Sequence, residues 1–196
     1  MQMTNTIAGV FRPADKVRGV AYDLLIVICG SLLVGISAKI RVYLPFSPVP
    51  VTGQTFVVLM LGALFGSYRG GLTMLAYLVE GVLGLPVFTS ISGVAALFGP
   101  TGGYLVGFVV AAYLVGRLAE LGWDRRVTTT VAAMLIGDAV LLAFGFVWLT
   151  LLLADVRTAF IAGVVSFIPG DILKIAIAAA VLPAGWKLLK QLRIKN

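Results

Sequence analysis

The sequence predicts an all-α polytopic membrane protein with six transmembrane helices and both termini in the cytoplasm, and three observations lead to this fold class. Hydrophobic residues make up 60% of the 196 positions and charged residues only 12%, whereas a soluble domain averages about 45–50% apolar and about 25% charged residues. The apolar residues fall into six runs, of which the longer ones match the roughly 20 helical residues that span a bilayer core. The positive charges gather on one side of these runs. A disordered chain, a nucleic-acid-binding module and an ordinary soluble enzyme do not fit this composition.

The chain divides into an arm and one membrane domain. Residues 1–20 contain four charged side chains and no long apolar core, so they are expected to form a cytoplasmic arm rather than a cleaved signal peptide. Residues 21–196 contain no linker and are expected to form a single six-helix transmembrane domain. The expected spans are, in chain order, 22–38, 54–65, 71–85, 103–121, 127–153 and 159–182. The second and third are short and could instead form a re-entrant hairpin, which would leave both termini on the same side.

The positions of lysine and arginine predict the orientation. Eleven of them flank the spans on the side of the termini and three flank the other side. The eleven are Arg12, Lys16, Arg18, Arg69, Arg117, Arg125, Arg126, Lys187, Lys190, Arg193 and Lys195, and the three are Lys39, Arg41 and Arg157. Because cytoplasmic loops are enriched in Lys and Arg, both termini are expected in the cytoplasm, as in a multi-pass protein of the inner (cytoplasmic) membrane. The net charge of +7 is then a topology signal, and no nucleic-acid partner is expected.

The residue types that the chain lacks limit its chemistry. There is no histidine, and the one cysteine, Cys29, lies in an apolar run. Histidine acid–base catalysis, histidine–metal ligation, an intrachain disulfide and a cysteine-cluster metal site are therefore excluded, and no metal or cofactor is expected. The Gly-rich turn at 99–104 lacks the Gly-Lys-Ser/Thr ending of a phosphate-binding loop. Any ATP hydrolysis must therefore come from another subunit.

Two charged residues stand about half-way along the last span. Asp171 and Lys174 are three positions apart, so on a helix they share one face. Each costs about 2.5–3.5 kcal/mol at the bilayer centre on insertion scales, and such residues normally face the bundle interior and mark a substrate or ion path. The plainer alternative is a mutual ion pair that only fixes the helix. An apolar pair would do that at lower cost, so a ligand-binding role is the favoured interpretation.

Other candidates carry weaker signals. Asp138 and Glu80 are the other acids within apolar runs, and each could pair with Lys174, line a pocket or lie near a span end. The turn that opens the fourth span, with Thr101, Gly102 and Gly103, could bring backbone N–H groups to a ligand or simply allow tight helix packing.

Three sequence blocks together resemble one protein family. The blocks are 44–55 (LPFSPVPVTGQT), 84–88 (GLPVF) leading to 98–105 (FGPTGGYL), and 168–174 (IPGDILK). In this order and spacing they are similar to the BioY family, the substrate-binding component of biotin transporters of the energy-coupling-factor type. The resemblance extends from the first span to the last.

The resemblance implies a function, partners and a site. A BioY-like chain captures biotin from outside, is not an enzyme, and usually works in the lipid bilayer with a transmembrane coupling protein and two cytoplasmic ATPase subunits. Biotin has a ureido ring with two N–H donors and one carbonyl acceptor, an apolar bicycle and a carboxylate tail. Either Asp171 and Lys174 bind the ureido ring, or Lys174 neutralises the tail. The candidate substrate-binding residues are Gln54, Phe88, Thr101, Gly102, Gly103, Tyr104, Asp171 and Lys174.

The chain departs from some relatives at two places. Those relatives carry an arginine directly after Gly-Gly-Tyr and an asparagine in the preceding Gly-rich loop, whereas this chain has Leu105 and no asparagine in 89–93. The start of the fourth helix, at Thr101 to Gly103, is the substitute expected for the carboxylate. A bulky residue at Gly102 should then weaken biotin more than an analogue without the acid.

Three other functions remain as alternatives. An S component for a different small vitamin would share the fold, but the biotin-type blocks oppose it. An intramembrane enzyme that uses Asp171 or Asp138 as an acid–base group would need a nucleophile–base pair or metal cluster that the sequence does not show. A purely structural membrane subunit would leave the buried Asp and Lys without a purpose.

Overall fold

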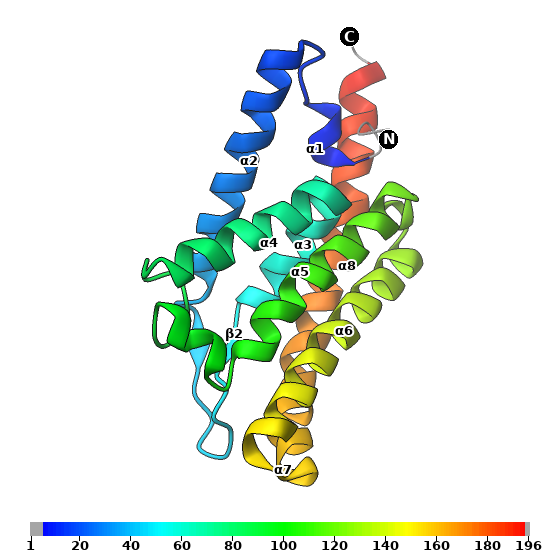
Figure 1. The fold of residues 1–196 in the computed structure, drawn as a ribbon. Coiled ribbons are helices and arrows are strands. Elements are labelled where there is room, and N and C mark those ends of the chain that lie inside the picture. The colour runs from blue at the N-terminus through cyan, green and yellow to red at the C-terminus, as the bar shows by residue number, and fades with distance from the viewer. Residues whose placement is uncertain (1–5, 195–196) are drawn as a thin grey trace.

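The computed structural model describes residues 6–194 of the chain (Figure 1). Lys195 and the first five residues of the predicted arm lie outside this range. The elements are, in order, α1 (Ile7–Val10), α2 (Lys16–Ser37), β1 (Arg41–Val42), β2 (Val51–Thr52), α3 (Gln54–Phe65), α4 (Ser67–Val82), the 3-10 turn η2 (Val94–Phe98), α5 (Gly102–Glu120), the 3-10 turn η3 (Trp123–Arg125), α6 (Val127–Leu153), α7 (Val156–Phe160), the π-helical turn η4 (Ile161–Val165) and α8 (Ile168–Ile194).

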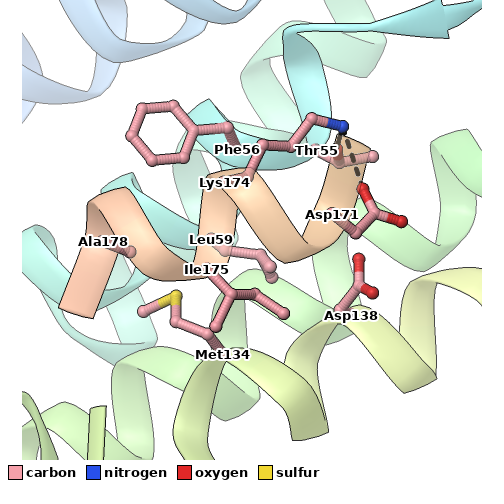
Figure 2. Close-up of a pocket in the computed structure, with 9 residues that line it drawn as sticks. All are labelled: Thr55, Phe56, Leu59, Met134, Asp138, Asp171, Lys174, Ile175 and Ala178. Atoms are coloured by element: carbon pink, nitrogen blue, oxygen red, sulfur yellow. Dashed lines mark hydrogen bonds and ion pairs between the residues drawn. The ribbon is translucent and has the colours of Figure 1, made fainter. Parts of the chain in front are cut away.

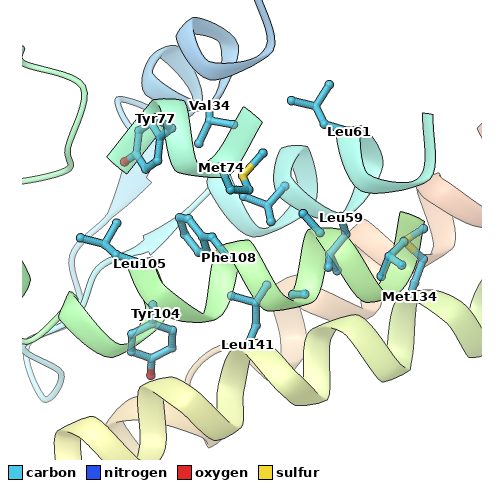
Figure 3. Close-up of a cluster of buried hydrophobic side chains, with 14 of the residues drawn as sticks. Val34, Leu59, Leu61, Met74, Tyr77, Tyr104, Leu105, Phe108, Met134 and Leu141 are labelled. Atoms are coloured by element: carbon cyan, nitrogen blue, oxygen red, sulfur yellow. The ribbon is translucent and has the colours of Figure 1, made fainter. Parts of the chain in front are cut away.

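The helices form one bundle in which α5 is central. Helix α5 packs against α3, α4 and α6, while α8 packs against α6 and α3, and α2 against α4. Both ends of the described chain lie at one end of the bundle, and the β1–β2 hairpin and α7 lie at the opposite end (Figure 1). The buried apolar cluster lies along α5, with Met74 and Tyr77 contributed by α4 and Leu141 by α6 (Figure 3). A buried stripe of this kind is what anchors neighbouring helices to one another.

The lengths of the helices agree with a membrane protein. Among the described residues, four helical stretches are long and apolar enough to cross a bilayer: α2, α5, α6 and the composite stretch Val156–Leu192. Helix α3 has 12 residues and α4 has 16, so both are short, as the sequence predicted. They join at Gly66, whose φ of 87° is a left-handed backbone angle that glycine adopts without a steric penalty.

Two helix limits differ from the expected spans. Helix α2 begins at Lys16 rather than near residue 22, because the carboxylate of Asp15 accepts a hydrogen bond from the backbone N–H of Arg18 at 2.9 Å and caps the helix there. The last helix was expected to end near 182, but α8 continues through Pro183 to Ile194. Proline removes one backbone hydrogen bond, and membrane helices tolerate that loss.

The hairpin end is tied to a π-helical turn. Strands β1 and β2 pair antiparallel, and the proline-rich loop between them reaches η4, where the hydroxyl of Ser47 donates to the carbonyl of Ala162 at 2.8 Å. The next carbonyl, of Gly163, accepts from the hydroxyl of Tyr104 at 2.5 Å. A π-turn interrupts the regular i→i−4 hydrogen bonds of the helix. The hydroxyls of Ser47 and Tyr104 therefore donate to backbone carbonyls at the point where the helix is irregular.

Candidate functional site

The two charged residues of the last span form a buried ion pair. Lys174 Nζ lies 2.9 Å from Asp171 Oδ1, and the side chains are 17% and 5% exposed. Lys174 also donates to the hydroxyl of Thr55 on α3 at 2.7 Å (Figure 2). The expected shared face is thus confirmed. Lys174 retains one N–H for a further acceptor, and Asp171 Oδ2 is buried without a hydrogen-bond partner.

An inner cavity adjoins this pair between α3, α6 and α8. It has a volume of only about 10 Å³ and is lined by Thr55, Phe56, Leu59, Met134, Asp138, Asp171, Lys174, Ile175 and Ala178. Figure 2 shows the carboxyl group of Asp138, on α6, directed toward that of Asp171 on α8. The polar side of this cavity is therefore made of two carboxyls, one ammonium and one hydroxyl.

An outer cavity lies toward the hairpin end. Its volume is about 30 Å³, below the roughly 300–1,000 Å³ typical of small-molecule sites, so its walls must move apart to admit a ligand. It is lined by Val49, Pro50, Thr52, Gln54, Thr55, Phe88, Thr89, Thr101, Tyr104, Leu105, Phe108 and Phe167. Thr55 lines both cavities. The ion pair, bonded to Thr55, therefore lies where the two cavities approach each other.

The walls of the outer cavity are held by hydrogen bonds and aromatic contacts. Gln54 Nε2 donates to the hydroxyl of Tyr77 at 2.7 Å, and the hydroxyl of Thr89 donates to Gln54 Oε1 at 2.8 Å. Phe88 packs edge-on against Tyr77 with ring centroids 5.3 Å apart, and Tyr104 stacks on Phe167 at 5.5 Å. These contacts leave an apolar cavity with a few fixed polar groups, which suits an apolar ligand with polar ends.

Two cations hold the cavity wall from the hairpin side. Lys39 Nζ donates to the carbonyl of Phe88 at 3.1 Å, and Arg41 donates to the carbonyl of Thr89. Within residues 6–194, neither cation has an acidic partner. In the sequence both cations serve only as topology signals, and their position beside the cavity could not be predicted from it.

The structure separates the predicted site residues into three groups. Gln54, Phe88, Thr101 and Tyr104 line the outer cavity, and Asp171 and Lys174 line the inner one. The remaining two, Gly102 and Gly103, line a different apolar groove of about 450 Å³ together with Leu97, Val106, Ala143, Phe144, Val147 and Trp148.

The two glycines allow close packing. A side chain on Gly102 would collide with the carbonyl of Leu97, and one on Gly103 with Trp148 on α6. The indole of Trp148 also donates to the carbonyl of Gly99 at 2.8 Å. Of the two meanings that the sequence left open for this turn, tight packing is the one that the geometry displays.

The two other acids within the apolar runs, Glu80 and Asp138, lie in different parts of the bundle. Glu80, on α4, accepts a hydrogen bond from Ser31 on α2 at 2.6 Å, so it joins two helices away from both cavities. Asp138 lines the inner cavity. Sequence reasoning missed Thr89 and Phe167, because neither residue type is conspicuous in so apolar a chain.

The sequence model of the BioY family matches residues 5–191. The chain belongs to the BioY family. It is 34% identical over 164 residues to the biotin transporter BioY of Rhizobium etli, covering 80% of this chain and 88% of that protein. It is 36% identical over 139 residues to the biotin transporter BioY of Thermotoga maritima, covering 70% and 81%.

A solved structure has the same fold as this BioY-family chain. The S-component for biotin from an ECF-type ABC transporter superposes with a TM-score of 0.78 at 25% sequence identity, covering 89% of this chain and 95% of that one. BioY is a family of transport components rather than of enzymes. The fold and family together make the chain a multi-pass membrane protein.

Proposed function

We propose that this chain is the high-affinity biotin-binding subunit of an energy-coupling-factor type transporter. The observation that carries the proposal is the buried Asp171–Lys174 pair, which lies beside a mostly apolar cavity in a chain of the BioY family. The relatives named as biotin transporters agree with it. A buried ion pair adds little to folding stability, which makes a ligand the better reason for its position.

The charge distribution favours one orientation of biotin. The Asp171–Lys174 pair is neutral as a whole, and so is the ureido ring. The free N–H of Lys174 can donate to the ureido carbonyl, while Asp171 can accept from a ureido N–H. The carboxylate tail, in contrast, needs a cation that no acid already neutralises. We therefore assign the ring to the ion pair.

Lys39 and Arg41 are the cations that fit the tail. Both are bonded to carbonyls of residues that line the outer cavity, and neither has an acidic partner in the described part of the chain. The tail of a biotin whose ring lies at Lys174 would extend through the outer cavity toward the hairpin. This assignment replaces the helix start at Thr101 to Gly103 as the proposed carboxylate site, since Gly102 and Gly103 border another groove.

We propose six membrane-crossing helical segments with both termini in the cytoplasm. The segments are α2, α3, α4, α5, α6 and the last stretch from α7 to α8. The described ends of the chain lie at the same end of the bundle (Figure 1), and most lysines and arginines flank the segments at that end. The location is then the inner (cytoplasmic) membrane, with the outer cavity on the external side.

The partners follow from the same assignment. The sequence contains no phosphate-binding loop, so a transporter built on this chain takes its energy from elsewhere. We propose a transmembrane coupling protein and two cytoplasmic ATPase subunits. Copurification of these subunits with the tagged chain from its native membrane tests the assembly, and recovery of the chain without them opposes it.

Equilibrium binding tests the function directly. The detergent-purified chain should bind labelled biotin with a stoichiometry of about one, as expected for one ligand at the Asp171–Lys174 pair. Unlabelled biotin should displace the label, and other small vitamins, including thiamine and riboflavin, should not. Displacement by another vitamin at lower concentration than biotin would assign the chain to that vitamin instead.

A further inference from the structure

A third ionisable residue faces the ion pair. Asp138, on α6, is only 8% exposed, and its carboxyl points toward Asp171 across the inner cavity (Figure 2). Within residues 6–194 Asp138 forms no ion pair, and Asp171 Oδ2 is buried without a hydrogen-bond partner. A carboxyl group without a bonded cation thus faces an unpaired carboxylate oxygen inside the bundle.

The charges of the cavity do not balance if both carboxyls are ionised. Lys174 is the one cation that lines it, and it bonds to Asp171 Oδ1 at 2.9 Å. Helix α3 contributes only Thr55, Phe56 and Leu59, and α6 adds Met134 beside Asp138. Burial of an unpaired carboxylate is far more costly than burial of a neutral acid. When two carboxyls share a site, one keeps its proton.

The geometry identifies which carboxyl is neutral. Asp171 is bonded to the ammonium, whereas Asp138 has no bonded cation. The other titratable group near Asp171 is Tyr104 on α5, whose hydroxyl is already engaged with the carbonyl of Gly163. Asp138 is therefore the group that holds the proton, and Asp171 Oδ2 is the free acceptor that it faces.

We propose that Asp138 is a positioning residue for biotin binding: its protonated carboxyl donates to Asp171 Oδ2, directly or through one water. This inference rests on the proposed function, because the ligand is biotin. In this arrangement Lys174 fixes one oxygen of Asp171 and Asp138 fixes the other. Asp171 stays ionised and keeps a defined orientation toward the ureido N–H groups. Ionisation of Asp138 would place a second negative charge beside Asp171 and weaken that arrangement.

Two substitutions of similar size separate the roles of the proton and of the charge. Asp138→Asn is neutral and retains an N–H donor, whereas Asp138→Leu is neutral and has none. At pH 7 the Asn variant should bind biotin within about threefold of the wild type, since it keeps the hydrogen bond. The Leu variant should bind biotin at least about tenfold more weakly than the wild type, because the buried acceptor Asp171 Oδ2 is left unpaired. Size-exclusion profiles and thermal unfolding establish that both variants fold.

The dependence of biotin affinity on pH distinguishes a protonated Asp138 from a residue with only a structural role. Wild-type affinity should fall at high pH more steeply than that of Asp138→Asn, because only the wild type can ionise at this position. Loss of the Lys174 proton affects both proteins and cancels in the comparison. Identical pH profiles would overturn the proposal. So would tenfold weaker binding by Asp138→Asn at pH 7, or wild-type affinity in a folded Asp138→Leu.

An infrared measurement separates this proposal from the proposed function. Reconstituted wild-type protein should show the carbonyl band of a buried protonated carboxylic acid, and Asp138→Asn should lack that band. If the wild type fails to bind biotin but the band is present and disappears in the variant, the proposed function fails and the proton assignment stands. If the band is absent from the wild type, the proton assignment is wrong even when biotin binds.

Discussion

The ammonium of Lys174 lies 2.7 Å from the hydroxyl of Thr55, so a hydrogen bond joins α8 to α3 at the border of the two cavities. A lysine side chain is long and flexible, and its loss of freedom on binding is costly. The Thr55 hydroxyl and the Asp171 carboxylate together reduce that freedom before a ligand arrives. Preorganised groups of this kind raise affinity mainly by lowering the cost of ordering.

Thr55→Val should therefore weaken biotin binding without removing any charge. The valine has nearly the same shape but leaves the ammonium of Lys174 with one partner fewer, so we expect an affinity loss of about tenfold. Thr55→Ser restores the hydroxyl and should bind within about threefold of the wild type. Isothermal titration of the three purified proteins measures this difference. Equal affinities for Val and Ser would show that the Thr55 hydroxyl does not position Lys174.

The outer cations should discriminate between biotin and its neutral derivatives. Arg41→Gln should reduce the affinity for biotin by about threefold or more, because a partly exposed cation near a carboxylate contributes modestly. Biotin methyl ester, which lacks the negative charge, should bind the wild type and Arg41→Gln with similar affinity. Lys39→Gln should behave in the same way.

Arg157 provides the matched control for the outer cations. It follows Asp155 at the hairpin end and is not among the residues that line the outer cavity. Arg157→Gln removes a charge from the same side of the protein and should leave biotin affinity unchanged. An equal loss in all three variants would assign the effect to overall surface charge, and no loss in Arg41→Gln and Lys39→Gln would place the tail elsewhere.

A substitution at the start of α5 can show whether the glycines there serve helix packing or ligand binding. Gly103→Val would force α5 away from Trp148 and should cost about 1–3 kcal/mol of stability, as overpacked sites usually do. Thermal unfolding should show the loss, and biotin and its methyl ester should be affected to the same extent. A selective loss for biotin would support the helix start as the carboxylate site after all.

Asp124, at the α5–α6 connection, should make the stability of the protein depend on pH. It lies in η3, where its Oδ2 accepts from the indole N–H of Trp186 on α8 at 2.6 Å. Burial is the main cause that raises the pKa of Asp124 to about 6, above the unfolded value of 3.8, against the opposing effect of the Trp186 hydrogen bond. The folded state therefore binds the proton more tightly, so this contribution to stability is complete below about pH 4 and is lost as pH rises to about 6.

The size of the Asp124 effect can be bounded. A shift of this magnitude corresponds to roughly 3 kcal/mol at most. Thermal unfolding of wild type and Asp124→Asn between pH 4 and 7 measures it, because asparagine can still accept from Trp186 but does not titrate. As the pH rises across this range, the stability of the wild type should fall relative to that of Asp124→Asn. A constant difference would mean that Asp124 does not titrate there.

The helices could be predicted because their signal is local. Long apolar runs and the spacing of Asp171 and Lys174 depend on the chain itself. Each of the predicted apolar runs contains helix and the ion pair is present, while the number of membrane crossings stays a prediction. The π-turn at 161–165 could not be predicted, because its carbonyls are satisfied by Ser47 and Tyr104 from distant segments. The end of the last helix was expected near residue 182, whereas α8 continues through Pro183 to Ile194.

The candidate site was predictable only where charge made a residue conspicuous. Thr55 and Thr89 are ordinary residues in the sequence, and only the fold places their hydroxyls on Lys174 and Gln54. The positions of Lys39 and Arg41 beside the cavity depend on the β1–β2 hairpin and the loop at 88–89. Contacts between segments so far apart in the chain leave no periodic trace in the sequence.

Biotin binding by a variant that loses the ion pair but keeps the fold shows whether Asp171 and Lys174 hold the ligand. Replacing both members of a buried pair by neutral residues is often tolerated, so Asp171→Asn combined with Lys174→Met should remain folded. Lys187→Ala, farther along α8 and exposed, is the control. The wild type and Lys187→Ala should bind biotin with equal affinity, and the double variant should lose about a hundredfold or more, as two charge-assisted hydrogen bonds are lost. Wild-type affinity in the folded double variant would contradict the account.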